Sequence, residues 1–174
     1  VYDGRVHIIW TGGEPTIPKH QRAIVAFDHY LDEYCLDKTG FFCKSYNEIE
    51  TNGTIVIQDD LFDMLDQINC SVKLANSGMP KKRRINAAAI EKMMTHENYW
   101  FKFVISTEDC LKEIETDFIK PFNIPHDKVL MMPGLDSQDN YHERTRFSLE
   151  MAKKYGYIGM SRLHVSAWDK LTGV

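Results

Sequence analysis

The chain lacks long apolar runs, a signal peptide and the common cysteine and histidine motifs. No apolar stretch among its 174 residues reaches the roughly 20 residues that a membrane helix needs, so we expect a cytoplasmic protein without membrane contact. Its four cysteines, at positions 35, 43, 70 and 110, match neither CxxC nor CxxxCxxC, which favours reduced thiols over a disulfide framework. The seven histidines form no HxxxH or HExxH pair, so the sequence indicates no protein-built zinc site.

A strong charge of one sign is also missing. The formal net charge is −4, which argues against a nucleic-acid platform. The one basic run, Lys81–Arg84, has no interleaved aromatic residues, and we interpret it as a solvated loop rather than a patch for nucleic acid. We therefore expect no nucleic-acid partner. A chain of this length and composition most simply forms a single domain over residues 1–174.

The most informative feature that is present is the run Thr11-Gly12-Gly13-Glu14-Pro15. It follows the apolar residues 6–10, which predict a short buried strand. The glycines let a ligand approach the backbone, the carboxylate of Glu14 is an acceptor for an ammonium group, and Pro15 fixes the turn into the next helix. On spacing alone, an ordinary strand-to-helix turn is the favoured interpretation, because Gly-Gly turns are common.

Hydrophobic periodicity predicts alternating strands and helices along the whole chain. The predicted strands are residues 6–10, 47–51, 70–74, 100–106, 129–132 and 162–168, and the predicted helices are residues 18–36, 59–68, 85–96, 108–120 and 139–155. This alternation indicates parallel strands joined by right-handed crossovers. A doubly wound sheet and a partial barrel both satisfy it. In either fold, ligands bind at the carboxyl ends of the strands, where this chain is unusually polar.

Six motifs in a fixed order carry a family resemblance. TGGEP resembles the S-adenosylmethionine-binding motif of radical S-adenosylmethionine enzymes. Together with the five segments that follow it, the chain resembles the 7-carboxy-7-deazaguanine synthase family over essentially its whole length. These segments are ETNGT (50–54), SVKLANSGMP (71–80), FKFVIS (101–106), VLMMPG (129–134) and RLHVSAW (162–168). The resemblance implies a single α/β domain, the C-terminal part of a partial parallel (βα) barrel of the radical S-adenosylmethionine type, and a homodimer.

The same resemblance implies roles for individual residues. Thr11 would contact the pterin substrate, and so would the terminal carboxylate of Val174, which we expect to be the native C-terminus; a frayed surface tail is the alternative. S-adenosylmethionine would be bound by Gly12, Gly13, Glu14, Ser71, Val72, Lys73, Met132, Pro133, Gly134 and Leu135, with Glu14 receiving the ammonium group. A common family form has Gln-Pro where this chain has Met132-Pro133, which leaves backbone contacts in place and puts side-chain contacts in question.

The resemblance also implies the chemistry and the cofactors. The family uses a [4Fe–4S] cluster, S-adenosylmethionine and Mg²⁺ to contract the ring of 6-carboxy-5,6,7,8-tetrahydropterin, giving 7-carboxy-7-deazaguanine with loss of ammonia. Such an enzyme is a radical carbon–nitrogen lyase of queuosine biosynthesis. The three cysteines of a CxxxCxxC loop hold its cluster, and the position that helps to hold magnesium lies in the same segment.

That CxxxCxxC loop is absent from this chain. The chain begins at Val1, almost directly in a predicted strand, so we expect the cluster-binding segment to lie upstream of it. Two alternatives stay open: another radical S-adenosylmethionine enzyme, and a non-catalytic binding module that has lost the cluster. ETNGT together with SVKLANSG argues against the first alternative, and the encoded sequence upstream of Val1 distinguishes the second.

Overall fold

The computed structural model describes residues 6–40, 45–135 and 137–171. The chain divides into two compact units. Unit 1 contains Val1–Cys70 and Ile85–Tyr99, and unit 2 contains Ser71–Arg84 and Trp100–Val174. The expectation of a single domain over residues 1–174 stays a prediction.

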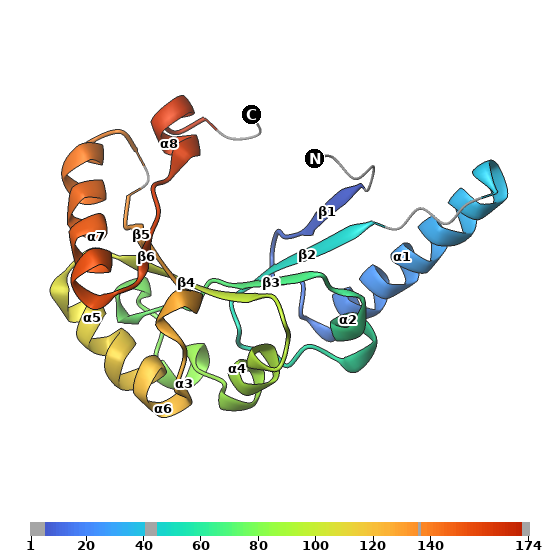
Figure 1. The fold of residues 1–174 in the computed structure, drawn as a ribbon, viewed down its shortest axis with the longest axis horizontal. Helices are drawn as coiled ribbons and strands as arrows, with labels where there is room; N and C mark the ends of the chain where they lie inside the picture. Colours follow the sequence, from blue (N-terminus) through green and yellow to red (C-terminus); the bar gives the residue numbers. More distant parts are fainter. Residues whose placement is uncertain (1–5, 41–44, 136, 172–174) are drawn as a thin grey trace. The chain divides into compact units, whose positions relative to one another are not determined.

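Unit 1 is built from parallel strands that alternate with helices (Figure 1). Its elements are β1 (His7–Trp10), α1 (Pro18–Thr39), β2 (Tyr46–Thr51), α2 (Asp59–Met64), β3 (Gln67–Cys70) and α4 (Ala87–Met94). Strand β2 pairs in parallel with both β1 and β3. Asn47, Ile49 and Thr51 of β2 are buried, and the residues between them are partly exposed, because successive side chains of a strand point to opposite faces. Parallel pairing brings the loops after β1 and β2 to the same edge.

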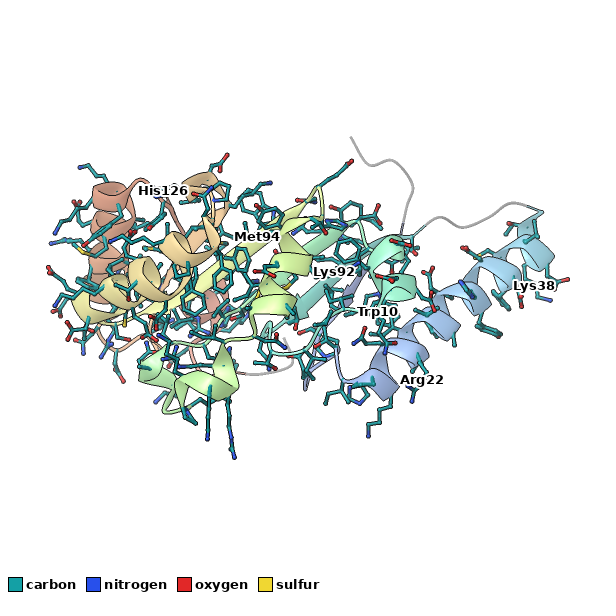
Figure 2. The ribbon with its side chains drawn as sticks, turned by 90° about the horizontal axis from the view of Figure 1, so that it is seen from below. Trp10, Arg22, Lys38, Lys92, Met94 and His126 are labelled. Carbon is teal, nitrogen blue, oxygen red and sulfur yellow. The ribbon has the colours of Figure 1, made fainter. Side chains whose placement is uncertain are left out.

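The long helix α1 begins directly after the turn that follows β1. Gln21 and Ile24 are its buried residues, whereas Arg22 and Lys38, near its two ends, are exposed (Figure 2). Trp10 fixes β1 to both neighbours: its indole N–H donates to Oδ1 of Asn47 at 3.0 Å, and its ring meets that of Phe27 edge-on at 5.7 Å. The start of the turn between β1 and α1 is therefore held against both β2 and α1.

Unit 2 repeats this alternation. Its elements are α3 (Lys81–Arg84), β4 (Tyr99–Ile105, of which Tyr99 belongs to unit 1), α5 (Glu108–Ile114), α6 (Lys120–Phe122), β5 (Val129–Pro133), α7 (Tyr141–Tyr155), β6 (Ile158–Gly159) and α8 (Leu163–Trp168). Short 3₁₀ turns lie at Ala75–Ser77 and His126–Lys128, and a π-helical turn at Glu115–Ile119. Strand β5 pairs in parallel with β4 and β6, and α7 packs against β5 and β6 (Figure 1).

The apolar side of unit 2 is built around aromatic side chains. Phe101, Phe103 and Phe118 are completely buried, and the rings of Phe103 and Phe118 meet at 5.3 Å. Phe118 lies in the π-helical turn, which joins α5 to α6. These three segments together occupy the helix predicted over residues 108–120, so that prediction is confirmed.

The predicted third strand is wrong in position. Residues 70–74 were expected to form it, but β3 is Gln67–Cys70 and the chain leaves the strand after Cys70. The helix predicted over 59–68 also ends early, because the backbone is already extended at Leu65, with ψ of 136°. Ile68, which fits the helical period, is instead a completely buried residue of β3 paired with Ile49. A short apolar run fits both periods, and pairing with β2 decides between them.

The predicted last strand, residues 162–168, is a helix. Leu163–Trp168 forms α8, and the sixth strand is the two-residue β6, which pairs with Leu130 and Met131 of β5. Only Val165 of α8 is buried, so this short segment carries little periodicity. Val174, the predicted substrate contact in the tail, lies outside the described residues.

Tyr157, directly before β6, makes the stability of the fold depend on pH. Its buried hydroxyl donates to the carboxylate of Glu115. Burial, with this hydrogen bond and the negative charge of Glu115, raises the pKa of Tyr157 above its usual range. The unfolded side chain ionises near pH 10, about its reference value, while the folded one stays neutral, so stability falls as the pH rises further.

We expect the free energy of unfolding to fall more steeply from about pH 9.5 to 11 in the wild type than in Tyr157→Phe, which has no ionisable group at this position. Urea unfolding at a series of pH values measures both slopes. Equal slopes in the two proteins would show that the hydroxyl of Tyr157 is not held neutral.

Candidate functional site

The carboxylate of Glu14 joins the ends of β1 and β2. Its Oε1 accepts from the backbone N–H of Thr16 at 3.1 Å, from the hydroxyl of Thr16 at 2.5 Å and from the hydroxyl of Thr51 at 2.6 Å. Its Oε2 accepts from the backbone N–H of Asn52 at 2.9 Å. Thr16 and Thr51 are buried, so these bonds satisfy polar groups that water does not reach.

The buried side-chain amide of Gln21 forms hydrogen bonds to the same region. The side-chain N–H groups of Gln21 donate to the carbonyls of Thr16, at 2.5 Å, and Val56, at 3.1 Å. Its Oε1 accepts from the backbone N–H of Gln58 at 2.7 Å. Gln21 therefore links the turn after β1 to the loop after β2 through backbone groups alone. No sequence motif pointed to Gln21, because a lone glutamine in a helix gives no signal.

The two glycines before Glu14 adopt a backbone that requires glycine. Gly12 and Gly13 have φ of 82° and 57°, in the left-handed region that other residues rarely enter. A Cβ built on either would meet no atom within 4 Å. Both residues are exposed. The turn therefore presents bare backbone with free space in front of it, as a ligand contact through the main chain needs.

Thr11 lies at the start of this exposed turn. Its hydroxyl donates to Oε2 of Glu50 at 3.3 Å, so the predicted substrate contact joins ETNGT to TGGEP. An apolar cavity of about 340 Å³ opens beside it, lined by Trp10, Thr11, Gly12, Pro15, His20, Ala23, Ile24 and Phe27. In unit 1 the structure thus brings together Thr11, Gly12, Gly13 and Glu14 with the end of β2.

The predicted residues Ser71, Val72 and Lys73 form the extended segment after β3. Val72 is buried, whereas Ser71 and Lys73 are half-buried. The ammonium group of Lys73 lies 3.4 Å from the hydroxyl of Ser71, which is a long hydrogen bond. Ser71 and Lys73 therefore lie on the same side of the segment, two residues apart, with Val72 on the other side.

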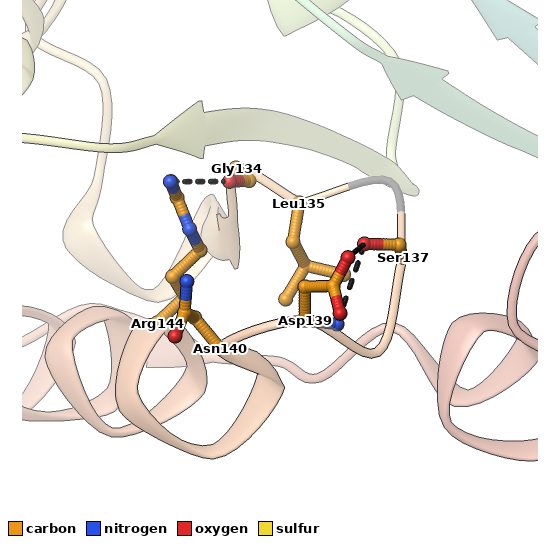
Figure 3. Close-up of a pocket in the computed structure, with 6 residues that line it drawn as sticks. All are labelled: Gly134, Leu135, Ser137, Asp139, Asn140 and Arg144. Carbon is orange, nitrogen blue, oxygen red and sulfur yellow. Dashed lines mark hydrogen bonds between the residues drawn. The ribbon is translucent and has the colours of Figure 1, made fainter.

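The predicted residues after β5 line a cavity in unit 2. Met132 and Pro133 end the strand, and Gly134 and Leu135 form the wall of a cavity of about 530 Å³, shown in Figure 3. Its other lining residues are Ser137, Asp139, Asn140 and Arg144. A Cβ on Gly134 would lie 2.1 Å from the hydroxyl of Ser106, so that hydroxyl would have to move for a larger residue to fit against Ser106, directly after β4.

Arginine side chains hold the backbone of this loop. Nη1 of Arg144, in the first turn of α7, donates to the carbonyl of Gly134 at 2.9 Å (Figure 3). The guanidinium of Arg162 donates to the carbonyl of Leu135. Neither arginine was predicted from the sequence. The rule that ligands bind after the carboxyl end of a parallel strand directs attention to residues 137–144, but no motif singles out Arg144, and Arg162 lay in the segment predicted as a strand.

The cysteines of the described residues do not form a metal centre. Cys35 lies in α1, Cys70 ends β3 and Cys110 lies in α5. Within residues 6–40, 45–135 and 137–171, no group of three or more His, Cys, Asp or Glu side chains is arranged to hold a metal ion. These residues therefore do not fit an iron–sulfur cluster. In the same ranges, no helix combines the length and apolarity needed to cross a membrane.

Comparison with known proteins gives two likenesses. No protein-family model matches the chain. A 7-carboxy-7-deazaguanine synthase of Pyrobaculum aerophilum is 28% identical over 167 residues, which are 96% of this chain and 67% of that protein. The crystal structure of QueE from Escherichia coli matches with a TM-score of 0.53 at 18% identity, over 90% of this chain and 56% of that chain. The chain thus spans little more than half the length of QueE.

The match to QueE confirms the expected fold class, an α/β fold with parallel strands that the chain shares with QueE. The match to the Pyrobaculum protein confirms the resemblance that the six motifs predicted. The chain is therefore similar, along nearly its whole length, to 7-carboxy-7-deazaguanine synthase.

Proposed function

We propose that the full-length protein is a 7-carboxy-7-deazaguanine synthase, a radical carbon–nitrogen lyase of queuosine or related deazapurine biosynthesis. It would convert 6-carboxy-5,6,7,8-tetrahydropterin to 7-carboxy-7-deazaguanine with loss of ammonia. The observation that carries this proposal is the similarity to a protein of that name over 96% of the chain. The exposed turn at Gly12 and Gly13 supports it, because the residues that the resemblance assigns to S-adenosylmethionine have free space before their backbone.

The turn after β1 is suited to the methionine portion of S-adenosylmethionine. A carboxylate has about four acceptor sites, two on each oxygen. Within the described residues, three donors from Thr16 and Thr51 share the two sites of Oε1, whereas Oε2 accepts one bond, from Asn52. Oε2 therefore keeps an acceptor site for an ammonium group. The free backbone at Gly13 would lie against the same ligand.

The segments of unit 2 would take the adenosyl portion. Under this proposal Ser71, Val72 and Lys73 lie along it, and Met132–Leu135 complete its pocket. Gly134 and Leu135 already line a cavity, which supports their assignment. Thr11, with its hydroxyl on Glu50, would contact the pterin, as would the terminal carboxylate of Val174.

The cofactors of the proposal include groups that these residues do not hold. A [4Fe–4S] cluster would supply the electron for radical chemistry, and we propose that its cysteine ligands and the Mg²⁺ site come from residues outside these 174. This chain's own residues would bind S-adenosylmethionine and the pterin, orient them and exclude water. We also propose a homodimer, which sedimentation of the purified full-length protein measures.

The full-length protein, purified without oxygen, is expected to carry one [4Fe–4S] cluster. Iron and sulfide analysis with electron paramagnetic resonance measures it. The 174-residue chain is the matched control and should hold no cluster after the same reconstitution, because its described residues offer no group of ligands. A full-length protein that takes up no iron under reducing conditions would contradict the enzyme proposal.

Glu14→Gln is expected to weaken S-adenosylmethionine binding by the full-length enzyme about tenfold, because a neutral amide replaces the charged acceptor. It should also lower stability, since an amide N–H then faces the N–H of Asn52. Thr51→Val is the matched control: it removes a donor to the same carboxylate but keeps the charge, so it should lower stability with little change in affinity.

Calorimetric titration well below the melting temperature of each variant separates binding from folding. Wild-type affinity in Glu14→Gln would make Glu14 a structural residue only. An equal loss of affinity in Thr51→Val would show that the order of the turn, and not the charge of Glu14, governs affinity for S-adenosylmethionine.

A further inference from the structure

Arg84, the last residue of the basic run, is a buried side chain and not a solvated one. Its exposed fraction is 5%. Its Nε donates to the carbonyl of Met79 at 3.2 Å, and its Nη1 donates to the carbonyl of Lys73, also at 3.2 Å. Lys81–Arg84 forms the short helix α3, so the sequence interpretation of this run as a loop is wrong, and its interpretation as solvated is wrong for Arg84. Arg84 is the last residue of the segment 71–84, and its guanidinium thus fixes the backbone near the start of the same segment.

The charge of Arg84 is balanced from α5. Its guanidinium forms an ion pair with Glu113, whose side chain is 14% exposed. The same carboxylate accepts from the backbone N–H of Ala75, at 2.9 Å and 3.2 Å to its two oxygens. Glu113 thus fixes Ala75 while Arg84 fixes Lys73, two residues earlier. Removing one partner of such a pair leaves the other charge buried and unpaired, which is strongly destabilising.

The rest of the segment is anchored at separate points. The side-chain amide of Asn76 donates to the carbonyl of Val104 in β4 at 3.1 Å. Lys81 forms an ion pair with Asp117 at 2.7 Å, on the exposed side of the segment. Of these anchors in the described residues, Arg84 is the one that contacts the backbone of Ser71–Lys73, which the proposed function assigns to S-adenosylmethionine. Because the carbonyl of Lys73 is fixed, the peptide plane after Lys73 and the direction of the Lys73 side chain are restricted as well.

We propose that Arg84, held by Glu113, is a positioning residue for S-adenosylmethionine binding: it fixes the backbone at Lys73 and thereby the segment Ser71–Lys73. The inference rests on the proposed function, which assigns that segment to the adenosyl portion. A planar guanidinium suits this task, because it donates to two carbonyls and a carboxylate at once in a fixed geometry. Lysine has no such fork, so Arg84→Lys is expected to be a poor substitute.

Two variants of the full-length, cluster-loaded enzyme separate positioning from stability. Arg84→Met leaves Glu113 unpaired and should lower both the melting temperature and the affinity for S-adenosylmethionine. Arg84→Met combined with Glu113→Gln removes both charges but keeps an acceptor for Ala75. In the double variant we expect the melting temperature to recover, while the dissociation constant stays raised about tenfold, since the donor to Lys73 is still missing. The KM for the carboxypterin should change little.

Lys81→Ala is the matched control, because it removes a second basic residue of the same short helix without contact to Lys73. It should keep wild-type affinity. Recovery of both melting temperature and affinity in the double variant would overturn the inference, and so would an equal loss of affinity in Lys81→Ala. A wild-type enzyme that holds its cluster but binds no S-adenosylmethionine would overturn the proposed function itself, and this inference with it.

Discussion

The carboxylate of Glu14 is the interaction on which the candidate site of unit 1 depends. Four hydrogen bonds from Thr16, Thr51 and Asn52 make this one side chain the common anchor of the turn after β1 and the end of β2, although Glu14 and Thr51 are 37 residues apart along the chain. With the turn fixed in this way, Gly12 and Gly13 keep their left-handed backbone and stay bare towards solvent. A binding surface made of backbone needs such an anchor, because glycine contributes no side chain to hold itself in place.

In unit 2, positively charged side chains fix the backbone of the candidate site, whereas in unit 1 the negatively charged Glu14 does so. Its loops leave carbonyl groups without partners in a helix or strand, and arginine side chains donate to them. Arg84 holds Lys73, Arg144 holds Gly134 and Arg162 holds Leu135. Each of these carbonyls belongs to a residue that the family resemblance assigns to S-adenosylmethionine. The arginines that fix the backbone are thus different residues from those proposed to contact S-adenosylmethionine. They also belong to other segments of the chain.

The sequence predicted the parts of the fold that periodicity and turn residues determine. Strand β1, helix α1 and strand β5 were predicted within three residues of their ends, because long periodic runs or Gly and Pro bound them. Ile68 and the segment 162–168 were assigned to the wrong element. In both cases a short run fits two periods, and pairing or packing with distant residues decides the outcome.

The residues of the candidate site likewise divide into those that the sequence predicted and those that it did not. TGGEP identified Gly12, Gly13 and Glu14, since a motif of fixed residue types is visible in one sequence. Gln21, Arg84 and Arg144 were missed, because each acts on backbone groups and any backbone serves as a partner. Arg84 was also hard to predict because of its neighbours in the sequence: in the run Lys81–Arg84 nothing distinguishes the one buried residue from the exposed ones.

The most direct measurement is an anaerobic assay of the full-length protein with 6-carboxy-5,6,7,8-tetrahydropterin, S-adenosylmethionine and a reductant, followed by mass spectrometry of the products. We expect 7-carboxy-7-deazaguanine together with released ammonia, and neither when S-adenosylmethionine is left out. An enzyme that carries its cluster and cleaves S-adenosylmethionine, yet leaves the pterin unchanged, would contradict the assignment of the substrate.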